Sequence, residues 1–261
     1  MNNFINLAKK EFENSDKEIF PFIFEEKQYW LKKARATKPN KIQKFFYKFF
    51  PFELLIPSLY KTPKEALEFE SSKLKEFKTL GINVPNIVYK CEDFFVLEDS
   101  GETIDAFFRY KNINENEFYI ILDKLILELS KIHNLNQFHG GSQIRNFTYK
   151  EERIYVLDFE ESYYENIDIK SLQYRDFLLF ILSFIKIKES RIKVNFYYII
   201  EKYLEFTDNK DFIIRLNKFA KKISFIIWFA NRKFIKKLLG SDLIYFLDLF
   251  EILNNLKINT K

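Results

Sequence analysis

The chain has 261 residues, 47% of them hydrophobic, with 42 Lys and Arg, 37 Asp and Glu, and a formal net charge of +5. One Cys and two His exclude an intrachain disulfide framework and a zinc cluster built on Cys or His. The N-terminal segment is too charged for a signal peptide, and no stretch approaches the roughly 18 apolar residues that span a bilayer. We therefore expect a cytoplasmic protein with a sizeable core, forming one large domain or two lobes.

The first predicted elements are two paired strands. Residues 18–35 are rich in aromatic and β-branched side chains, which favours a hairpin with its turn near Glu25 and Glu26. Pro21 predicts that the first strand lies at a sheet edge. Residues 36–63 are basic and interrupted by Pro, so we expect an irregular segment there.

A helix is predicted over residues 63–80. Thr62 and Glu65 have the spacing of a capping box, and Gly81 suits the C-terminal cap. The elements predicted after this helix are two strands within 82–99, a long amphipathic helix over 115–136, a hairpin with strands 145–149 and 153–159, and helices from 171 onward.

The order of strands, one helix, strands and then mostly helices indicates the fold class. Strands gathered before a run of helices are typical of an α+β protein. We therefore predict a small N-lobe that contains a sheet and one helix, followed by a larger helical C-lobe.

The pattern with the clearest chemistry is His139-Gly140-Gly141, followed by Asn146 and then Asp158. The hairpin predicted between Asn146 and Asp158 can bring these two side chains together. An amide oxygen and a carboxylate suit Mg²⁺ that holds a nucleotide polyphosphate, because water and phosphates complete the metal's shell.

The segments LSKIHNLNQFHGGSQIRNF and VLDFEES resemble the catalytic and metal-binding loops of the protein-kinase-like superfamily. The similarity is strongest to its bacterial branches, namely lipopolysaccharide-core kinases, RIO-type kinases and aminoglycoside-phosphotransferase-like enzymes. It covers residues 18–185. The resemblance implies a bilobal protein-kinase-like fold, with an N-lobe over 1–98 and a C-lobe over 99–261.

The resemblance also implies roles for residues of the N-lobe. A strand Lys contacts the nucleotide phosphates; this is Lys32, with Lys33 as the alternative, since only one of two neighbours points inward. Glu70 on the predicted helix pairs with this Lys. Backbone groups near Glu98 face the adenine.

In the C-lobe, the same resemblance implies that Asn146 and Asp158 hold Mg²⁺ and that ATP and Mg²⁺ are the cofactors. Asp176 is implied to brace the catalytic loop. His139 is expected to be a structural residue of that loop.

Two departures from the superfamily pattern affect the expected chemistry. Gly141 stands where these kinases have the catalytic Asp, and the spacing does not favour Ser142, Arg145 or Glu160 as a substitute base. No Gly precedes Gly81, so a Gly-rich loop over the phosphates is missing. The first hairpin, with its acidic turn, is expected to occupy that place.

The segment KKARATKPNKIQKFFYK contains seven cationic residues and no acidic one. It predicts a peripheral contact with an anionic membrane surface or a phosphorylated glycolipid through residues 32–52; a solvated face is the alternative. A net charge of +5 gives little reason to expect nucleic-acid binding.

Together these features predict an ATP- and Mg²⁺-dependent phosphotransferase. By resemblance, its acceptor is a sugar hydroxyl of a cell-envelope glycolipid such as lipopolysaccharide core, met at the inner face of the membrane. The alternative is a pseudokinase, which binds nucleotide or acts as a scaffold without phosphoryl transfer. Transfer of another group from ATP, such as AMP, is a third possibility on the same fold.

Overall fold

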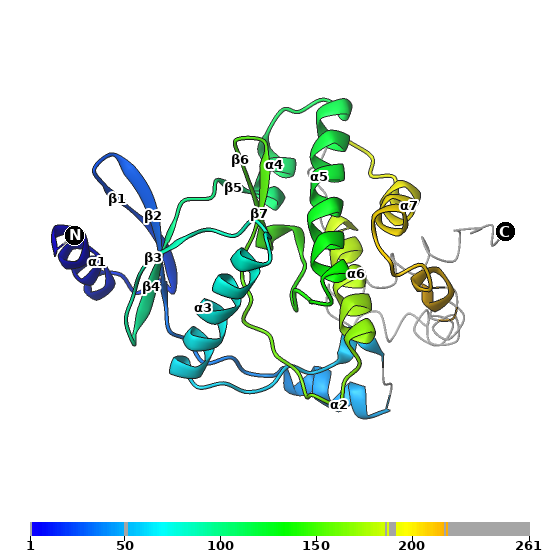
Figure 1. Ribbon diagram of the computed structural model, residues 1–261, viewed down its shortest axis with the longest axis horizontal. Coiled ribbons are helices and arrows are strands. Elements are labelled where there is room, and N and C mark those ends of the chain that lie inside the picture. Colours follow the sequence, from blue (N-terminus) through cyan, green and yellow to red (C-terminus); the bar gives the residue numbers. More distant parts are fainter. Residues whose placement is uncertain (1, 50–51, 186, 188–191, 217, 219–261) are drawn as a thin grey trace, which may run out of the picture.

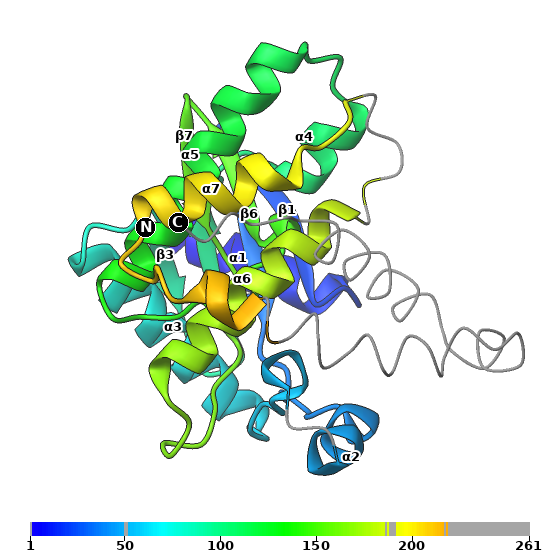
Figure 2. The same ribbon diagram turned by 90° about the vertical axis from the view of Figure 1, so that its right-hand side faces the viewer.

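The protein has the bilobal α+β architecture that the order of elements predicts (Figure 1). A small antiparallel sheet with two helices forms one end, and a larger helical lobe forms the other (Figure 1). In Figure 2 the helical lobe faces the viewer. The computed structural model describes residues 2–49, 52–185, 187, 192–216 and 218.

The sheet of the small lobe has four antiparallel strands in the order β1-β2-β4-β3. The first strand forms a free edge, as expected from Pro21, which has no N–H to donate to a second neighbour. Glu25 and Glu26 have φ values of 48° and 64°, the positive values that a tight two-residue hairpin turn requires. The strands are β1 (Ile19–Phe24), β2 (Lys27–Lys33), β3 (Ile87–Lys90) and β4 (Phe94–Glu98).

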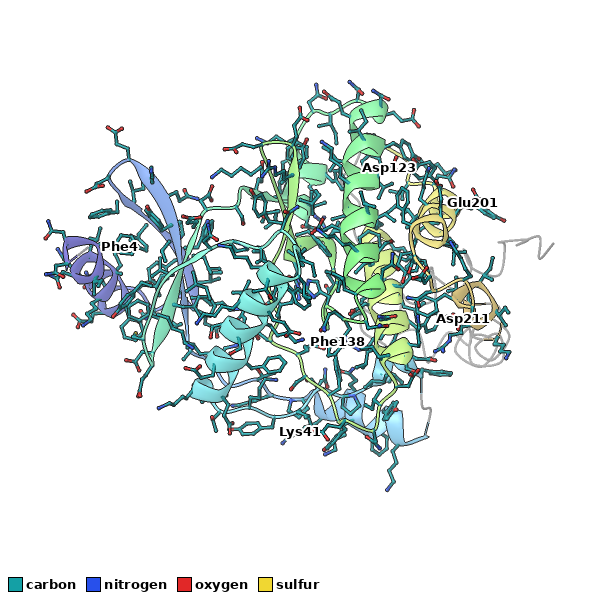
Figure 3. The ribbon with its side chains drawn as sticks, viewed as in Figure 1. Phe4, Lys41, Asp123, Phe138, Glu201 and Asp211 are labelled. Atoms are coloured by element: carbon teal, nitrogen blue, oxygen red, sulfur yellow. The ribbon has the colours of Figure 1, made fainter. Side chains whose placement is uncertain are left out.

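Helix α1 (Asn2–Asn14), which the sequence analysis did not predict, covers the outer face of this sheet (Figure 1). The ring of Phe4 contacts the aromatic side chains of β1 and β2 (Figure 3). Lys33 Nζ donates a hydrogen bond of 2.7 Å to the carbonyl of Phe12, near the end of the helix. This cation also suits the negative end of the helix dipole.

Helix α3 (Pro63–Thr79) lies between the sheet and the large lobe (Figure 1). The predicted capping box is present: the Thr62 side chain accepts from the Glu65 N–H, and Glu65 Oε2 accepts from the Thr62 N–H at 2.8 Å. Gly81 follows the helix with φ +75°, which confirms the predicted cap.

The connection from β2 to α3 contains a helix where an irregular segment was predicted. Helix α2 (Lys41–Phe49) begins soon after Pro39, and no Pro or Gly interrupts the nine residues. A short 3-10 helix, η1 (Glu53–Leu55), follows and packs against the large lobe. Ile56 is buried there with Tyr163, so this connection spans both lobes.

The structure confirms three predictions for the large lobe: the long central helix, the hairpin, and the helices after residue 171 as far as they are described. The residues after 218 lie outside the described part of the chain. Among the described residues, no helix combines the length and apolar character needed to cross a membrane. The elements are β5 (Glu102–Thr103), α4 (Ile104–Tyr110), α5 (Glu115–Asn134), η2 (Ile144–Asn146), β6 (Phe147–Lys150), β7 (Arg153–Val156), α6 (Ile169–Ile185) and α7 (Phe196–Phe206).

Candidate active site

Three residues predicted from the sequence meet between the lobes. Lys32 Nζ lies 2.8 Å from Glu70 Oε1 on α3 and 2.8 Å from Asp158 Oδ1, which follows β7. Lys33 points to the opposite face of β2, toward α1. Strand alternation therefore leaves Lys32, not Lys33, as the Lys that faces the large lobe.

Glu160 is a third carboxylate on the same ammonium group, with its Oε1 2.8 Å from Lys32 Nζ. The sequence analysis considered Glu160 only as a substitute base. The sequence offered only the closeness of Glu160 to Asp158 as a signal for this contact, because the left-handed backbone of Asp158 interrupts strand alternation.

Three carboxylates surround the Lys32 ammonium group, and Arg35 Nη2 lies 3.9 Å from the one supplied by Glu160. Burial raises the pKa of Glu70 to about 7, against the opposing effect of Lys32. Burial also acts to raise the pKa of Asp158, but the Lys32 ammonium holds that pKa below its usual value. Burial favours the neutral form of Lys32, yet the surrounding carboxylates outweigh it and raise its pKa.

Glu70 should make the stability of the ligand-free protein depend on pH. Its pKa is about 7 in the folded protein and about 4.3 when unfolded, so the folded state binds more protons between these values and its stability falls as pH rises. Between pH 5 and 8, the unfolding free energy of the wild type should fall by about 3 kcal/mol relative to Glu70→Gln. Urea unfolding of both proteins at the two pH values measures this difference. A constant difference would contradict the raised pKa.

The backbone of Asp158 has φ +66°, a left-handed conformation that is uncommon for any residue other than Gly. The neighbouring Phe159 is fully buried, and its ring packs edge-on against Phe77, with centroids 4.6 Å apart. The ring of His139 also packs against the ring of Phe159, with centroids 5.0 Å apart. Packing of the neighbour therefore holds Asp158 in this conformation, as is common for backbone strain at functional sites.

Asn146 is positioned by the loop that precedes it. Its Nδ2 donates a hydrogen bond of 2.7 Å to the carbonyl of Gly141. Its own carbonyl accepts the N–H of Leu157 at 2.9 Å, which places it beside the residue before Asp158. Because the amide nitrogen is committed to Gly141, the amide oxygen is the atom that Asn146 can offer to a metal ion.

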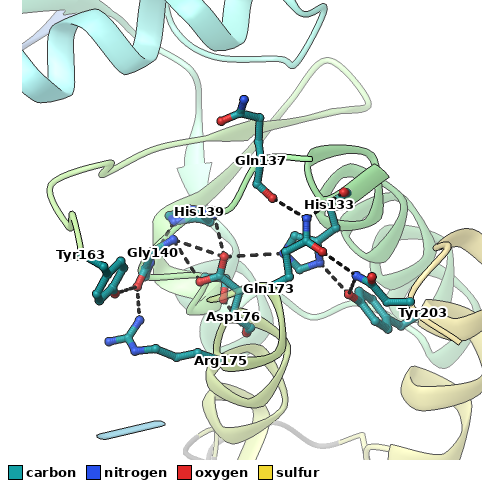
Figure 4. Close-up of polar contacts among 12 residues, drawn as sticks. His133, Gln137, His139, Gly140, Tyr163, Gln173, Arg175, Asp176 and Tyr203 are labelled. Atoms are coloured by element: carbon teal, nitrogen blue, oxygen red, sulfur yellow. Dashed lines mark hydrogen bonds and ion pairs between the residues drawn. The ribbon is translucent and has the colours of Figure 1, made fainter. Parts of the chain in front are cut away.

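Asp176 on α6 braces the loop of His139 and Gly140, as predicted (Figure 4). Its carboxylate accepts the N–H of His139 at 2.6 Å and that of Gly140 at 3.0 Å. His133 Nε2 lies 3.5 Å from the same carboxylate. Burial lowers the pKa of both His residues, which suits structural roles for them.

A second set of side chains holds the carbonyl of Gly140. This oxygen accepts hydrogen bonds from Tyr163 Oη, at 3.0 Å, and from the guanidinium group of Arg175 (Figure 4). Arg175 also forms an ion pair of 2.9 Å with Glu161. The loop that carries Gly141 is therefore fixed from both sides.

The structure gives no support to the three substitute bases. Ser142 is fully buried, and its hydroxyl donates to the Asp176 carbonyl. Arg145 is exposed, and Glu160 is bound to Lys32.

Glu98, near which adenine contacts were predicted, ends β4 with an exposed side chain. Its N–H donates to the carbonyl of Asn86 at 3.0 Å, and its carboxylate accepts from the Asn86 side chain. The next residue, Asp99, was missed by the sequence analysis and makes more contacts. Its carboxylate accepts hydrogen bonds from Trp30 Nε1 at 2.9 Å and Lys150 Nζ at 3.0 Å.

The acidic hairpin turn lies away from Lys32, the residue that the resemblance assigns to the phosphates. Lys32 pairs with Ile19 at the start of β1, whereas Glu25 and Glu26 lie at the other end of the hairpin. Five residues of strand separate Lys32 from that turn, or about 17 Å. Residues 15–18 lie beside the Lys32 end instead, where the Lys33 N–H donates to the carbonyl of Glu18.

The chain is similar to a relative in sequence and to several solved structures, two of which are described here. A Haemophilus influenzae protein described as uncharacterized is 30% identical over 241 residues, which are 91% of this chain and 90% of that protein. WaaP in complex with acyl carrier protein has a TM-score of 0.48 at 12% identity, covering 91% of this chain and 97% of that one. The Neurospora crassa PAN3 pseudokinase has a TM-score of 0.37 at 14% identity, covering 97% and 71%. No protein-family model matches the chain.

Proposed function

The chain belongs to the family of the uncharacterized Haemophilus influenzae protein, and we propose that it is an ATP- and Mg²⁺-dependent phosphotransferase. The observation that carries this proposal is the contact of Lys32 with Glu70, Asp158 and Glu160 between the lobes. Asp158 in this cluster offers carboxylate oxygens, the type of ligand that a hard divalent cation takes.

Four residues of the site have proposed roles in binding the nucleotide and its metal ion. Lys32 binds the nucleotide phosphates and Glu70 positions Lys32. Asn146 and Asp158 hold Mg²⁺ through oxygen atoms, and phosphates and water complete its shell. When bound, Mg²⁺ would neutralise negative charge on the phosphoryl group that is transferred. The adenine is proposed to lie near Glu98, where the lobe over 1–98 meets the lobe over 99–261.

The proposed acceptor is a sugar hydroxyl of a cell-envelope glycolipid such as lipopolysaccharide core. Its support is the sequence resemblance together with the surface of α2. Lys41, Lys44 and Lys48 are exposed on this helix, as is 60% of Phe45. Cations next to an aromatic side chain favour an anionic membrane surface, so we propose peripheral contact there through residues 32–52.

A pseudokinase is the second candidate, because Gly141 supplies no carboxylate. Phosphoryl transfer depends mainly on positioning and electrostatics, so the missing base need not abolish it. The hydrogen bond between Asn146 and the Gly141 carbonyl supports the first candidate, since a scaffold has no need for an oriented metal ligand.

Thermal unfolding with and without ATP and Mg²⁺ tests the proposal. A ligand at about 100 times its Kd stabilises a protein by about 2.7 kcal/mol, which is a shift on the order of 5–10 °C for a chain of this size. We expect this shift to require Mg²⁺ and to disappear in Asp158→Ala. The exposed Asp208→Ala is the matched control and should keep the shift. No shift at millimolar ATP would contradict the phosphotransferase and favour a scaffold.

A further inference from the structure

Trp30 lies on the same face of β2 as Lys32, two residues closer to the hairpin turn. Side chains two residues apart on one face of a strand are separated by about 6.8 Å. The indole packs against the main core, whereas Tyr29, on the other face, packs against the core beneath α1. Trp30 is therefore the next large side chain along the site from Lys32.

The indole is held in place by a chain of hydrogen bonds. Its Nε1 donates to Asp99 Oδ1 at 2.9 Å, and Lys150 Nζ on β6 donates to Asp99 Oδ2 at 3.0 Å and to the Asp99 carbonyl at 2.9 Å. Asp99 belongs to the linker between the lobes. These contacts, which we call the Trp30 latch, connect the sheet, the linker and the large lobe.

If Lys32 binds the phosphates, the rest of the nucleotide extends away from them. Along the face of β2 that carries Lys32, the extension toward the linker meets Trp30. A nucleobase needs a flat apolar surface and hydrogen-bonding partners. Trp30 and Asp99 offer these features, but in this structure they are bound to each other.

We propose that Trp30 is a gate for the nucleobase: the indole, held by Asp99 and Lys150, closes the position that the base takes. This inference rests on the proposed function, because it assumes that the phosphates bind at Lys32. Binding of a nucleotide then requires the Trp30 latch to open. When a site is open for only part of the time, its apparent Kd equals the intrinsic Kd divided by the open fraction. The gate should therefore weaken binding of a nucleotide and leave binding of a ligand without a base unchanged.

The test compares Mg·ATP with Mg·tripolyphosphate, which has the phosphates but no base. Trp30→Phe keeps an aromatic ring of smaller size and removes the indole N–H, and with it the hydrogen bond to Asp99 that closes the latch. We expect calorimetry to show about tenfold tighter binding of Mg·ATP in this variant and unchanged binding of tripolyphosphate. Tyr29→Phe, which alters the opposite face of β2, should leave both affinities unchanged. Lys150→Met provides a second opening variant that leaves β2 intact.

Fluorescence gives an independent readout. Mg·ATP should change the emission of the wild type, tripolyphosphate should not, and the change should be missing in Trp30→Phe. Suppose that the wild type binds Mg·ATP and that both Trp30→Phe and Lys150→Met bind it no more tightly than the wild type does. That result would overturn the gate and leave the proposed function standing. Failure of the wild type and both variants to bind either ligand would instead overturn the proposed function, and the gate with it.

Discussion

Gly141→Asp should raise ATP-dependent phosphate transfer by about 10²–10⁴-fold, the usual contribution of a general base. The loop is already fixed around this position, because Asn146 donates to its carbonyl and Asp176 holds the two residues before it. An added Cβ would lie 3.4 Å from Asn146 Nδ2, an ordinary contact, and the backbone of Gly141 is not left-handed. The backbone at this position therefore accepts a Cβ without rearrangement of the loop.

The measurement is release of phosphate from ATP, with water as the acceptor, since water can replace an unidentified hydroxyl. Gly141→Asn is the matched control: it has nearly the same shape but cannot accept the proton as a carboxylate does. We expect the asparagine variant to stay within a few-fold of the wild type. An unchanged or lower rate in Gly141→Asp, with Mg·ATP still bound, would contradict a weakened kinase and show that Gly141 belongs to a different function.

The parts of the site that the sequence predicted correctly depend on local rules. Alternation along β2 allowed only one of Lys32 and Lys33 to face the large lobe, and the capping box at Thr62 fixed where α3 begins. The residue at which α3 begins determines which of its side chains face the core, and Glu70 is one of the buried residues. These features are decided by residues within a few positions of one another.

The parts that the sequence did not predict depend on partners far away in the chain. Helix α1 has a charged sequence, and its larger apolar side chains are partly buried only because they pack against the outer face of the sheet. The turn at Glu25 and Glu26 was correctly located, but its distance from Lys32 follows from the strand register. The contacts of Asp99 with Trp30 and Lys150 likewise join segments about 50 to 70 residues apart.

Gly101→Ala should lower the free energy of unfolding by about 3 kcal/mol or more, a loss typical of strained backbone combined with overpacking. Gly101 has φ +94°, and an added Cβ would lie 2.3 Å from the carbonyl oxygen of Tyr149 and 2.8 Å from Cβ of Lys150. Neither atom is the end of a flexible side chain, so the linker or β6 must move. Thermal unfolding should show a midpoint lower by about 6–12 °C for a chain of this size.

Gly81→Ala separates the two causes of this loss. Gly81 also has positive φ, at +75°, but nothing lies within 4 Å of its added Cβ. This control therefore carries only the conformational cost of about 1–2 kcal/mol. A Gly101→Ala midpoint as high as that of Gly81→Ala would mean that the linker does not pack against β6 as closely as the structure describes. A lower midpoint would show that this contact is rigid, and so that Asp99, two residues earlier, is held beside Lys150 by the backbone as well as by its own ion pair.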